Sequence, residues 1–217
     1  MRPGYILLAL CPNALKIWVY NTFLGAKIHR TAKLGLSYLQ ARQIIIGAHA
    51  RLGHFNLIKN LDAFELGAHA QIDHFNTIKG ASGQHFQQEP GRVSAFRLGD
   101  YSSVGKRHYL DCSNTISIGH HSAIAGFNSS IYTHGINFEQ NQQQSAMTRI
   151  GDYCRVATSC VIVKGSQLPD CSILAANSTL HKAYDATHTL YSGVPAKPIK
   201  QYSAEAAYFH RQEGWTH

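Results

Sequence analysis

The sequence predicts an all-β solenoid in which short parallel strands coil into a triangular β-helix. The first observation is a six-residue step in aliphatic residues. It is unbroken at Ile150, Val156, Ile162, Leu168, Leu174 and Leu180. A strand has a side-chain period of two, so every sixth residue stays on one face, whereas the helix period of 3.6 cannot keep that register. These side chains are therefore predicted to point into the core.

The second observation is a small residue four positions after most of the aliphatic ones. These positions are Ala50, Ala70, Ser102, Ser122, Cys154, Cys160, Ser166, Ser172 and Ser178. The six-residue step also occurs earlier, at Ile46, Leu52, Ile58, Leu66, Ile72, Ile78, Leu98, Val104, Leu110, Ile118 and Ile124. Each hexapeptide is thus expected to form one face and one corner, with the small residue where the chain turns.

The third observation is a longer internal repeat. GAHARLGHFNLIK at 47–59 and GAHAQIDHFNTIK at 67–79 match at nine of thirteen positions, twenty residues apart. Three hexapeptides make eighteen residues, so the offset fits one coil plus a two-residue bulge. This offset predicts that the corresponding His and Asn side chains of the two segments stack on one another.

The N-terminal element comes first along the chain. Residues 1–43 are predicted to form a helical cap, with a helix over 12–24 that has Pro12 in its first turn. The β-helix is expected over 44–198. Capping elements are needed because a solenoid otherwise exposes strand edges at its ends.

Two insertions and a tail complete the predicted organisation. The six-residue step is lost at 80–97 and at 135–148, which are predicted to be loops pushed out of the β-helix. Loops on rigid scaffolds often carry function. Residues 199–217 are expected to be a helical tail, with a helix over 203–213 that begins at a Ser N-cap.

Composition limits the class of partner. The formal net charge is +8, although only 15% of residues are charged. Such a surface favours anionic partners such as phosphorylated cofactors, lipid-linked sugars or membrane headgroups. The Lys and Arg residues are scattered without a basic helix or an aromatic-basic motif, so no nucleic-acid partner is expected.

The cellular compartment is predicted from cysteines and apolar runs. Five cysteines without CxxC spacing disfavour a disulfide framework or a zinc knuckle and favour a cytoplasmic location. The sequence contains no run of about 20 apolar residues, so no membrane-spanning helix is predicted. No small-residue cleavage site follows the apolar stretch at 5–10, so no cleaved signal peptide is predicted. Residues 5–24, which include Trp18 and Tyr20, either cap the core or contact the inner face of a membrane peripherally.

Three stretches of the chain resemble the hexapeptide-repeat (left-handed β-helix) acyltransferases. They are YTHGI at 132–136, IGDYCRVATSCVIVKGSQLPDCSILAANSTL at 150–180 and LYSGVPAKPIK at 190–200. The likeness covers roughly residues 44–200. It is closest to the sugar O-acetyltransferase branch of exopolysaccharide and capsule assembly, which resembles the colanic-acid, maltose and galactoside acetyltransferases. The resemblance implies a left-handed coil, a homotrimer, acetyl-CoA in the cleft between neighbouring β-helices, and no metal.

The candidate catalytic residues are two histidines. Acyl transfer from a thioester to a hydroxyl needs a base, and a neutral imidazole suits that role near neutral pH. The resemblance implies that His134 is this general base. His108 is the second candidate, because it occupies a corner position where other repeats have a small residue; a coil loosened by the preceding loop explains it equally well. Asp111 would orient His108 or bind a sugar hydroxyl.

The remaining candidate residues would bind the two substrates. Asn128, Ser130 and Gln140 flank His134 and are candidate acceptor contacts, whereas Asn56 and Asn76 are expected to form a structural turn stack. The resemblance places the pantetheine arm of acetyl-CoA against backbone groups near four positions. These are Ala157, Thr158, Ala175 and Ala176. Lys197 and Lys200 would meet the CoA phosphates or simply form a basic tail.

Three classes of function remain open on the sequence. The leading one is an acyl-CoA-dependent O-acyltransferase acting on a sugar or glycan, with N-acylation of an amino sugar as a variant. A metal-dependent lyase resembling γ-class carbonic anhydrase would use His49/His54 and His69/His74, but it lacks a third His at the required separation. The third class is a non-catalytic trimeric scaffold.

Overall fold

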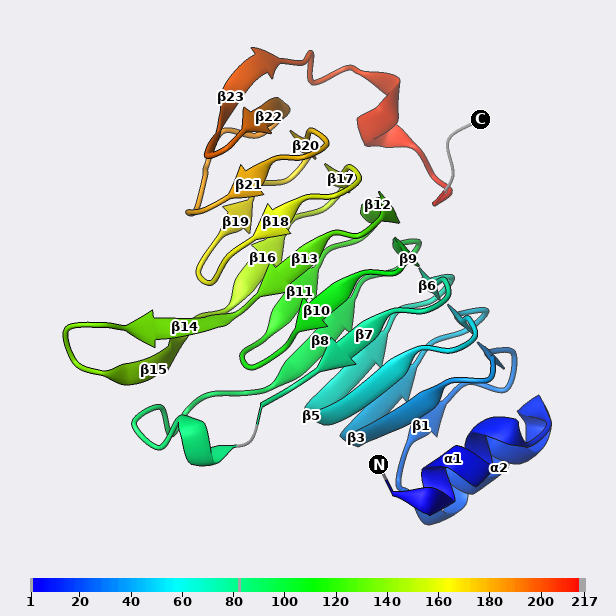
Figure 1. Cartoon of the computed structure of the whole chain (residues 1–217). Coiled ribbons are helices and arrows are strands. Elements are labelled where there is room, and N and C mark those ends of the chain that lie inside the picture. Colours follow the sequence, from blue (N-terminus) through cyan, green and yellow to red (C-terminus); the bar gives the residue numbers. More distant parts are fainter. Residues whose placement is uncertain (1, 82, 215–217) are drawn as a thin grey trace.

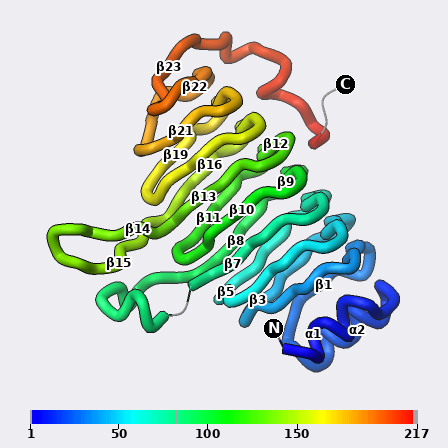
Figure 2. Tube along the Cα trace, in the orientation of Figure 1, coloured from blue at the N-terminus to red at the C-terminus, as the bar shows by residue number. Residues whose placement is uncertain are grey.

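The computed structural model describes residues 2–81 and 83–214. They form one column of parallel coils, with two helices at its N-terminal end and an extended segment at the other (Figure 1). The trace in Figure 2 shows the successive coils stacked along the column and two insertions projecting from the same side. No helix in these two ranges is long and apolar enough to cross a membrane.

Two short helices cover the open end of the first coil. Helix α2 (Asn13–Phe23) confirms the predicted helix, and Pro12 directly precedes it; helix α1 (Pro3–Leu10) was not predicted. The ammonium group of Lys16 donates to the carbonyl oxygens of Leu34 at 3.2 Å and Gly35 at 2.7 Å. The Tyr20 hydroxyl donates to the Leu39 carbonyl at 2.6 Å. These bonds satisfy carbonyl groups that have no preceding coil to pair with.

The column has three faces, and the chain passes through them in a fixed order. The first face contains β1 (Lys27–Ile28), β8 (Ala95–Leu98), β11 (Ile116–Ile118), β16 (Thr148–Ile150) and β19 (Gln167–Leu168). The second contains β2 (Lys33–Leu34), β4 (Arg51–Leu52), β6 (Gln71–Ile72), β9 (Ser103–Lys106), β12 (Ala123–Phe127), β17 (Arg155–Val156), β20 (Ile173–Leu174), β22 (Thr189–Gly193) and the antiparallel β23 (Ala196–Gln201). The third contains β7 (Thr77–Lys79), β10 (Tyr109–Asp111), β13 (Ser130–Tyr132), β18 (Val161–Ile162) and β21 (Thr179–Leu180). Two long strands, β3 (Tyr38–Ile46) and β5 (Leu57–Leu66), join the first and third faces.

Strand pairing confirms the predicted register. Ile150 pairs with Leu168, one coil of eighteen residues later, whereas Ile46 pairs with Leu66 across the twenty-residue repeat. All of the aliphatic residues that keep the six-residue step from Ile46 to Leu180 are buried, as are the small residues that follow them. The core therefore runs along the axis of the column.

The ends of the β-helix differ from the prediction. The solenoid begins before residue 44, because β1, β2 and β3 already pair in parallel with the next coil. At the other end β23 extends past residue 198, and the helix expected over 203–213 is absent. A single 3₁₀ turn at Ala207–His210 stands in its place. The tail instead lies along the column, with Phe209 buried and the Arg211 guanidinium bonded to the His121 carbonyl, so tertiary contacts override the local helical preference.

The two insertions are more ordered than loops. The first leaves the column after β7 and returns at β8, with one short 3₁₀ turn at Gly83–His85. The second is an antiparallel hairpin of β14 (His134–Asn137) and β15 (Gln142–Ser145). Both leave at the corner between the third and first faces, and Figure 1 shows them projecting from the same side.

Candidate active site

A histidine and an aspartate from neighbouring coils meet at the base of the hairpin. His134 is the first residue of β14, and its Nδ1 is hydrogen-bonded to Oδ2 of Asp111, the last residue of β10. Strand pairing brings them together, because Asp111 lies opposite Tyr132 in the parallel pair of β10 and β13. The Thr133 hydroxyl donates to the Asp111 carbonyl at 2.7 Å and fixes the turn between them.

The two partners differ in exposure. The side chain of Asp111 is 4% exposed and that of His134 is 37% exposed. The other carboxylate oxygen of Asp111 accepts hydrogen bonds from the Ser113 hydroxyl at 2.6 Å and the Ser113 N–H at 3.1 Å. A buried carboxylate held in this way accepts a hydrogen bond from Nδ1–H and leaves Nε2 of His134 as the basic nitrogen.

Asp111 therefore has a different partner from the one predicted. It does not contact His108 through a hydrogen bond but orients His134 instead. Its carboxylate is buried, and both oxygens already accept hydrogen bonds. The geometry is therefore that of a residue that positions His134.

The first insertion forms a wall beside His134. The Phe86 ring meets the His134 ring edge to face, with centroids 6.2 Å apart and an interplanar angle of 83°. Phe86 is buried, and the Arg92 guanidinium stacks on it 4.4 Å from the ring centroid. Arg92 also donates to the Ser113 carbonyl, so it ties the insertion to the turn that holds Asp111.

The two insertions are joined to each other by Glu89 and Ser145. One oxygen of the Glu89 carboxylate accepts the Ser145 N–H at 2.7 Å, and the other accepts the Ser145 hydroxyl. Ser145 lies opposite His134 in the hairpin, and its hydroxyl also accepts a bond from Asn114 Nδ2 at 2.9 Å. The hairpin thus enters the site at a fixed angle.

Sequence reasoning missed Phe86, Glu89, Arg92 and Ser145. All four belong to insertions without periodicity, so their mutual contacts leave no mark in the spacing. The one available signal was the isolated carboxylate of Glu89 in a segment otherwise rich in Gly, Gln and Pro.

His108 lies in a buried ladder of hydrogen bonds between coils. Asn76 N–H donates to Asn56 Oδ1, His108 N–H donates to Asn76 Oδ1, and Ser129 N–H donates to His108 Nδ1, at 2.8, 2.8 and 3.0 Å. Burial lowers the pKa of His108 to about 4. Its Nδ1 is already an acceptor, and the residue is only 2% exposed, so the geometry is that of a structural residue. The ladder also contains the predicted stack of Asn56 on Asn76.

The predicted acceptor residues are dispersed. Asn128 lies at the far end of β13 from His134, exposed at the corner between the second and third faces, and Ser130 begins that strand. Gln140 lies at the tip of the hairpin, where Asn137 Nδ2 donates to it at 3.2 Å. The structure therefore brings none of the three into hydrogen-bond contact with His134.

The predicted donor residues share one corner. Ala157, Thr158, Ala175 and Ala176 follow β17 and β20, between the second and third faces. The N–H groups of Ala157 and Ala175 bond the next coil, and the Thr158 hydroxyl donates to the Phe127 carbonyl at 3.0 Å. Lys197 and Lys200 are exposed on β23 at the end of the column.

The paired histidines weighed as metal ligands lie at two different corners. His49 stacks on His69 with centroids 4.9 Å apart, and His54 stacks on His74 at 5.3 Å. The first pair follows first-face strands and the second pair follows second-face strands. Across residues 2–81 and 83–214, no three His, Cys, Asp or Glu side chains are grouped to hold a metal ion.

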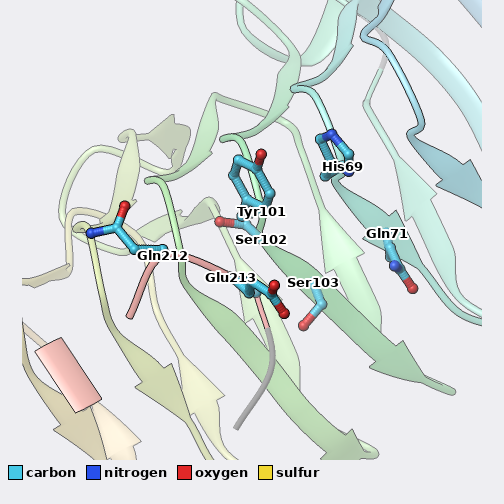
Figure 3. A pocket seen from close by; sticks show the side chains of 8 residues that line it. His69, Gln71, Tyr101, Ser102, Ser103, Gln212 and Glu213 are labelled. Atoms are coloured by element: carbon cyan, nitrogen blue, oxygen red, sulfur yellow. The ribbon is translucent and has the colours of Figure 1, made fainter. Parts of the chain in front are cut away.

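A hollow of about 560 Å³ lies away from His134, against the C-terminal tail. Figure 3 shows His69 and Tyr101 on its wall, with Gln212 and Glu213 of the tail across from them. Tyr101 belongs to a column of stacked rings that runs from His49 to Tyr153 along this corner. None of the predicted catalytic, acceptor-binding or cofactor-binding residues lines this hollow.

Comparison with known proteins identifies the fold. No protein-family model matches the chain, and no curated protein matches it. Among solved structures, a hexapeptide-repeat acetyltransferase of Vibrio cholerae complexed with acetyl-CoA is 21% identical, with a TM-score of 0.52 over 63% of this chain and 70% of that one. A mutant of AntD, an N-acyltransferase of Bacillus cereus, in complex with dTDP and coenzyme A, is 15% identical, with a TM-score of 0.55 over 85% of both chains. The fold is therefore the left-handed parallel β-helix of hexapeptide repeats, as predicted.

Proposed function

We propose that this protein is an acyl-CoA-dependent O-acyltransferase that moves an acetyl group onto a sugar or glycan hydroxyl, in the assembly of an exopolysaccharide, capsule or related glycoconjugate. The observation that carries the proposal is the pair of half-exposed His134 and buried Asp111 at the base of the two insertions. The fold, which also occurs in structures solved with acetyl-CoA and coenzyme A, supports it.

The chemistry follows from the tautomer that Asp111 imposes. Nε2 of His134 takes the proton of the acceptor hydroxyl as its oxygen attacks the thioester carbonyl carbon. The imidazolium formed is stabilised by the buried carboxylate of Asp111. When the carbon–sulfur bond breaks, His134 returns the proton to the departing thiolate, so the products are the acetyl ester and free CoA. No covalent link to the protein is needed, because holding both substrates together removes much of the entropic barrier.

The location of the donor residues supports a homotrimer. Asn128 lies at the corner that holds Ala157 and Ala175. The extended segment from Asn128 to His134 is six residues long, a distance of roughly 20 Å at the usual rise per residue. One chain therefore holds the base and the donor corner on opposite edges of its third face. Two copies packed side by side bring one chain's base toward its neighbour's corner, and closed rings are the common result of such contacts.

The substrate-binding residues are assigned on the same basis. Backbone groups of Ala157, Thr158, Ala175 and Ala176 would contact the pantetheine arm, and Lys197 and Lys200 would meet the phosphates. One backbone N–H at this corner would hold the oxyanion. Asn128, Ser130 and Gln140 would contact an acceptor from a neighbouring copy or from the hairpin tip.

A free-thiol assay tests the proposal. Purified protein receives acetyl-CoA together with mono- and oligosaccharides, including amino sugars, and the product is characterised by mass spectrometry. Release of CoA that depends on a neutral sugar, with an alkali-labile product, is expected. An alkali-stable amide would show N-acylation instead. Failure of every acceptor together with no rise in melting temperature on adding acetyl-CoA would contradict the proposal.

A further inference from the structure

The N-terminal end of the column has an unusual distribution of charge. Residues 1–61 contain eight of the 20 Lys and Arg residues and none of the 12 Asp and Glu residues. Residues 62–217 contain twelve of each, so the formal charge of +8 lies wholly in the first 61 residues. The folded chain concentrates this charge in the first coils and the two helices that cover them (Figure 1).

Helix α2 buries its one charged residue and leaves two of its large aromatic residues exposed. Lys16 is buried, with its ammonium bonded to the carbonyls of the first coil. Trp18 is 54% exposed and Phe23 is 66% exposed, and their rings pack edge to face 5.2 Å apart. An ordinary cap helix would present polar groups to water, so the outward surface of α2 is suited to an apolar neighbour.

Helix α1 continues the apolar surface. Leu7 is 67% exposed and Leu10 is 66% exposed, and Leu7 lines an apolar groove between the helices together with Leu24. We call the surface made by Leu7, Trp18, Phe23 and Leu24 the cap face. A cluster of exposed large apolar side chains on a protein surface marks an interaction site.

Basic side chains accompany the cap face. Arg2, Lys27, Arg30 and Lys33 are exposed and flank the helices in the chain. In the described part of the chain none of the four forms an ion pair; the ion pairs found there involve other residues. Apolar side chains that enter the headgroup region, with cations beside them, are the features that bind a protein to the surface of an anionic bilayer.

We propose that the cap face binds peripherally to an anionic lipid bilayer, with Arg2, Lys27, Arg30 and Lys33 meeting the headgroups. The helices, of eight and eleven residues, lie on the surface rather than cross it. This contact is independent of the acyl-transfer proposal, since it involves neither His134 nor the donor corner.

Vesicle co-sedimentation of the full chain tests the proposal. We expect binding to phosphatidylcholine vesicles that contain phosphatidylglycerol, weaker binding to phosphatidylcholine alone, and loss of most binding when salt is raised from roughly 0.05 to 0.5 M. The double variant Trp18→Ser/Phe23→Ser should bind at least about tenfold more weakly. Each of the single variants Lys27→Gln and Lys33→Gln should bind about fivefold more weakly.

Matched variants elsewhere serve as controls. Phe138→Ser at the hairpin tip removes a side chain that is 87% exposed, and Lys106→Gln removes an exposed charge on β9; both should bind vesicles like the parent protein. The proposal fails if the parent protein does not sediment with anionic vesicles at low salt, or if the cap-face variants bind as well as the controls. It also fails if Trp18→Ser with Phe23→Ser instead abolishes self-association in the absence of lipid, which would assign the surface to a second copy.

Discussion

His134 and His108 differ in what surrounds their rings. His134 has one nitrogen bound to a buried carboxylate and the rest of its ring half exposed. His108 has one nitrogen accepting a backbone N–H inside a ladder of hydrogen bonds, and burial lowers its pKa to about 4. The first arrangement favours proton transfer, and the second favours a ring that stays neutral near neutral pH.

Changing Asp111→Asn tests the positioning role. The amide cannot take the place of a carboxylate opposite an imidazolium, so we expect kcat to fall by roughly 10²–10⁴-fold while the KM for acetyl-CoA stays the same. The pH profile of kcat is the second readout, because a change that only loosened the turn at Ser113 would leave it in place. A variant with unchanged kcat and pH profile would show that Asp111 does not act through His134. Circular dichroism and melting temperature serve as the folding control.

His108→Asn tests the structural role through pH. Below pH 6.5 His108 binds a proton in the unfolded chain, whereas in the folded protein it does so only near pH 4. The contribution of His108 to the free energy of unfolding is therefore full above pH 6.5 and is lost as the pH drops toward 4. This loss is on the order of 3 kcal/mol. Asn occurs at the preceding rungs of the ladder, so the variant should keep its activity and lose that part of the pH dependence.

Denaturant unfolding at several pH values measures this effect. His181→Asn, at an exposed site, is the matched control and should leave the pH dependence of the parent protein unchanged. If His108→Asn abolished acyl transfer while the protein remained folded, the structural assignment would be wrong.

At the scale of elements, the two insertions form one unit. Glu89 ties the first insertion to Ser145 of the hairpin, and Phe86 and Arg92 fix it against His134 and Ser113. The strands beside the insertions, β7, β8, β10, β11, β13 and β16, each pair with a neighbour on both sides. The hairpin, which pairs only with itself, depends on Glu89 for its orientation.

Glu89→Ala should therefore loosen the hairpin without unfolding the column. Hydrogen bonds to a charged group contribute about 1.5–3 kcal/mol, so we expect the KM for the acceptor to rise roughly tenfold or more, with the KM for acetyl-CoA unchanged. Glu139→Ala, an exposed residue near the hairpin tip, is the control. Steady-state kinetics with the donor and the acceptor varied separately gives both constants; equal effects of the two variants would contradict the role of Glu89.

The sequence predicted the column but not the contacts within the site. The six-residue step identifies inward residues because strand geometry repeats every two residues. It missed the first coil because the step from Leu34 to Leu39 is shortened, although both residues pair with the next coil. The pairing of Asp111 with His134 depends on a register shift between Ile124 and Phe127, which moves the following strand along its neighbour. Such bulges have no reliable sequence signal.

At the scale of the whole molecule, the proposed site needs two copies of the chain. The base lies at one edge of the third face and the donor corner at the other. In this proposal one chain alone therefore does not bring the two substrates together. Sedimentation should give three times the 24.0 kDa of one chain.

Mixing two inactive variants tests the shared site. His134→Ala removes the base, and Ala176→Trp fills the donor corner at an exposed position. Co-expression of the two should restore activity in about a quarter of the sites, since random assortment pairs a good base with a good corner at that frequency. A mixture as inactive as its parents would place both groups on one chain and contradict the trimer proposal.

The measurement that tests the central claim most directly is acceptor-dependent CoA release by His134→Ala beside His120→Ala. His120 also has an aspartate partner, with Nδ1 3.4 Å from Asp100 Oδ2, but this pair is exposed and lies on another corner. We predict that His134→Ala lowers kcat by roughly 10²–10⁴-fold with acetyl-CoA binding intact, and that His120→Ala matches the parent protein. Undiminished release by a folded His134→Ala protein would contradict the account.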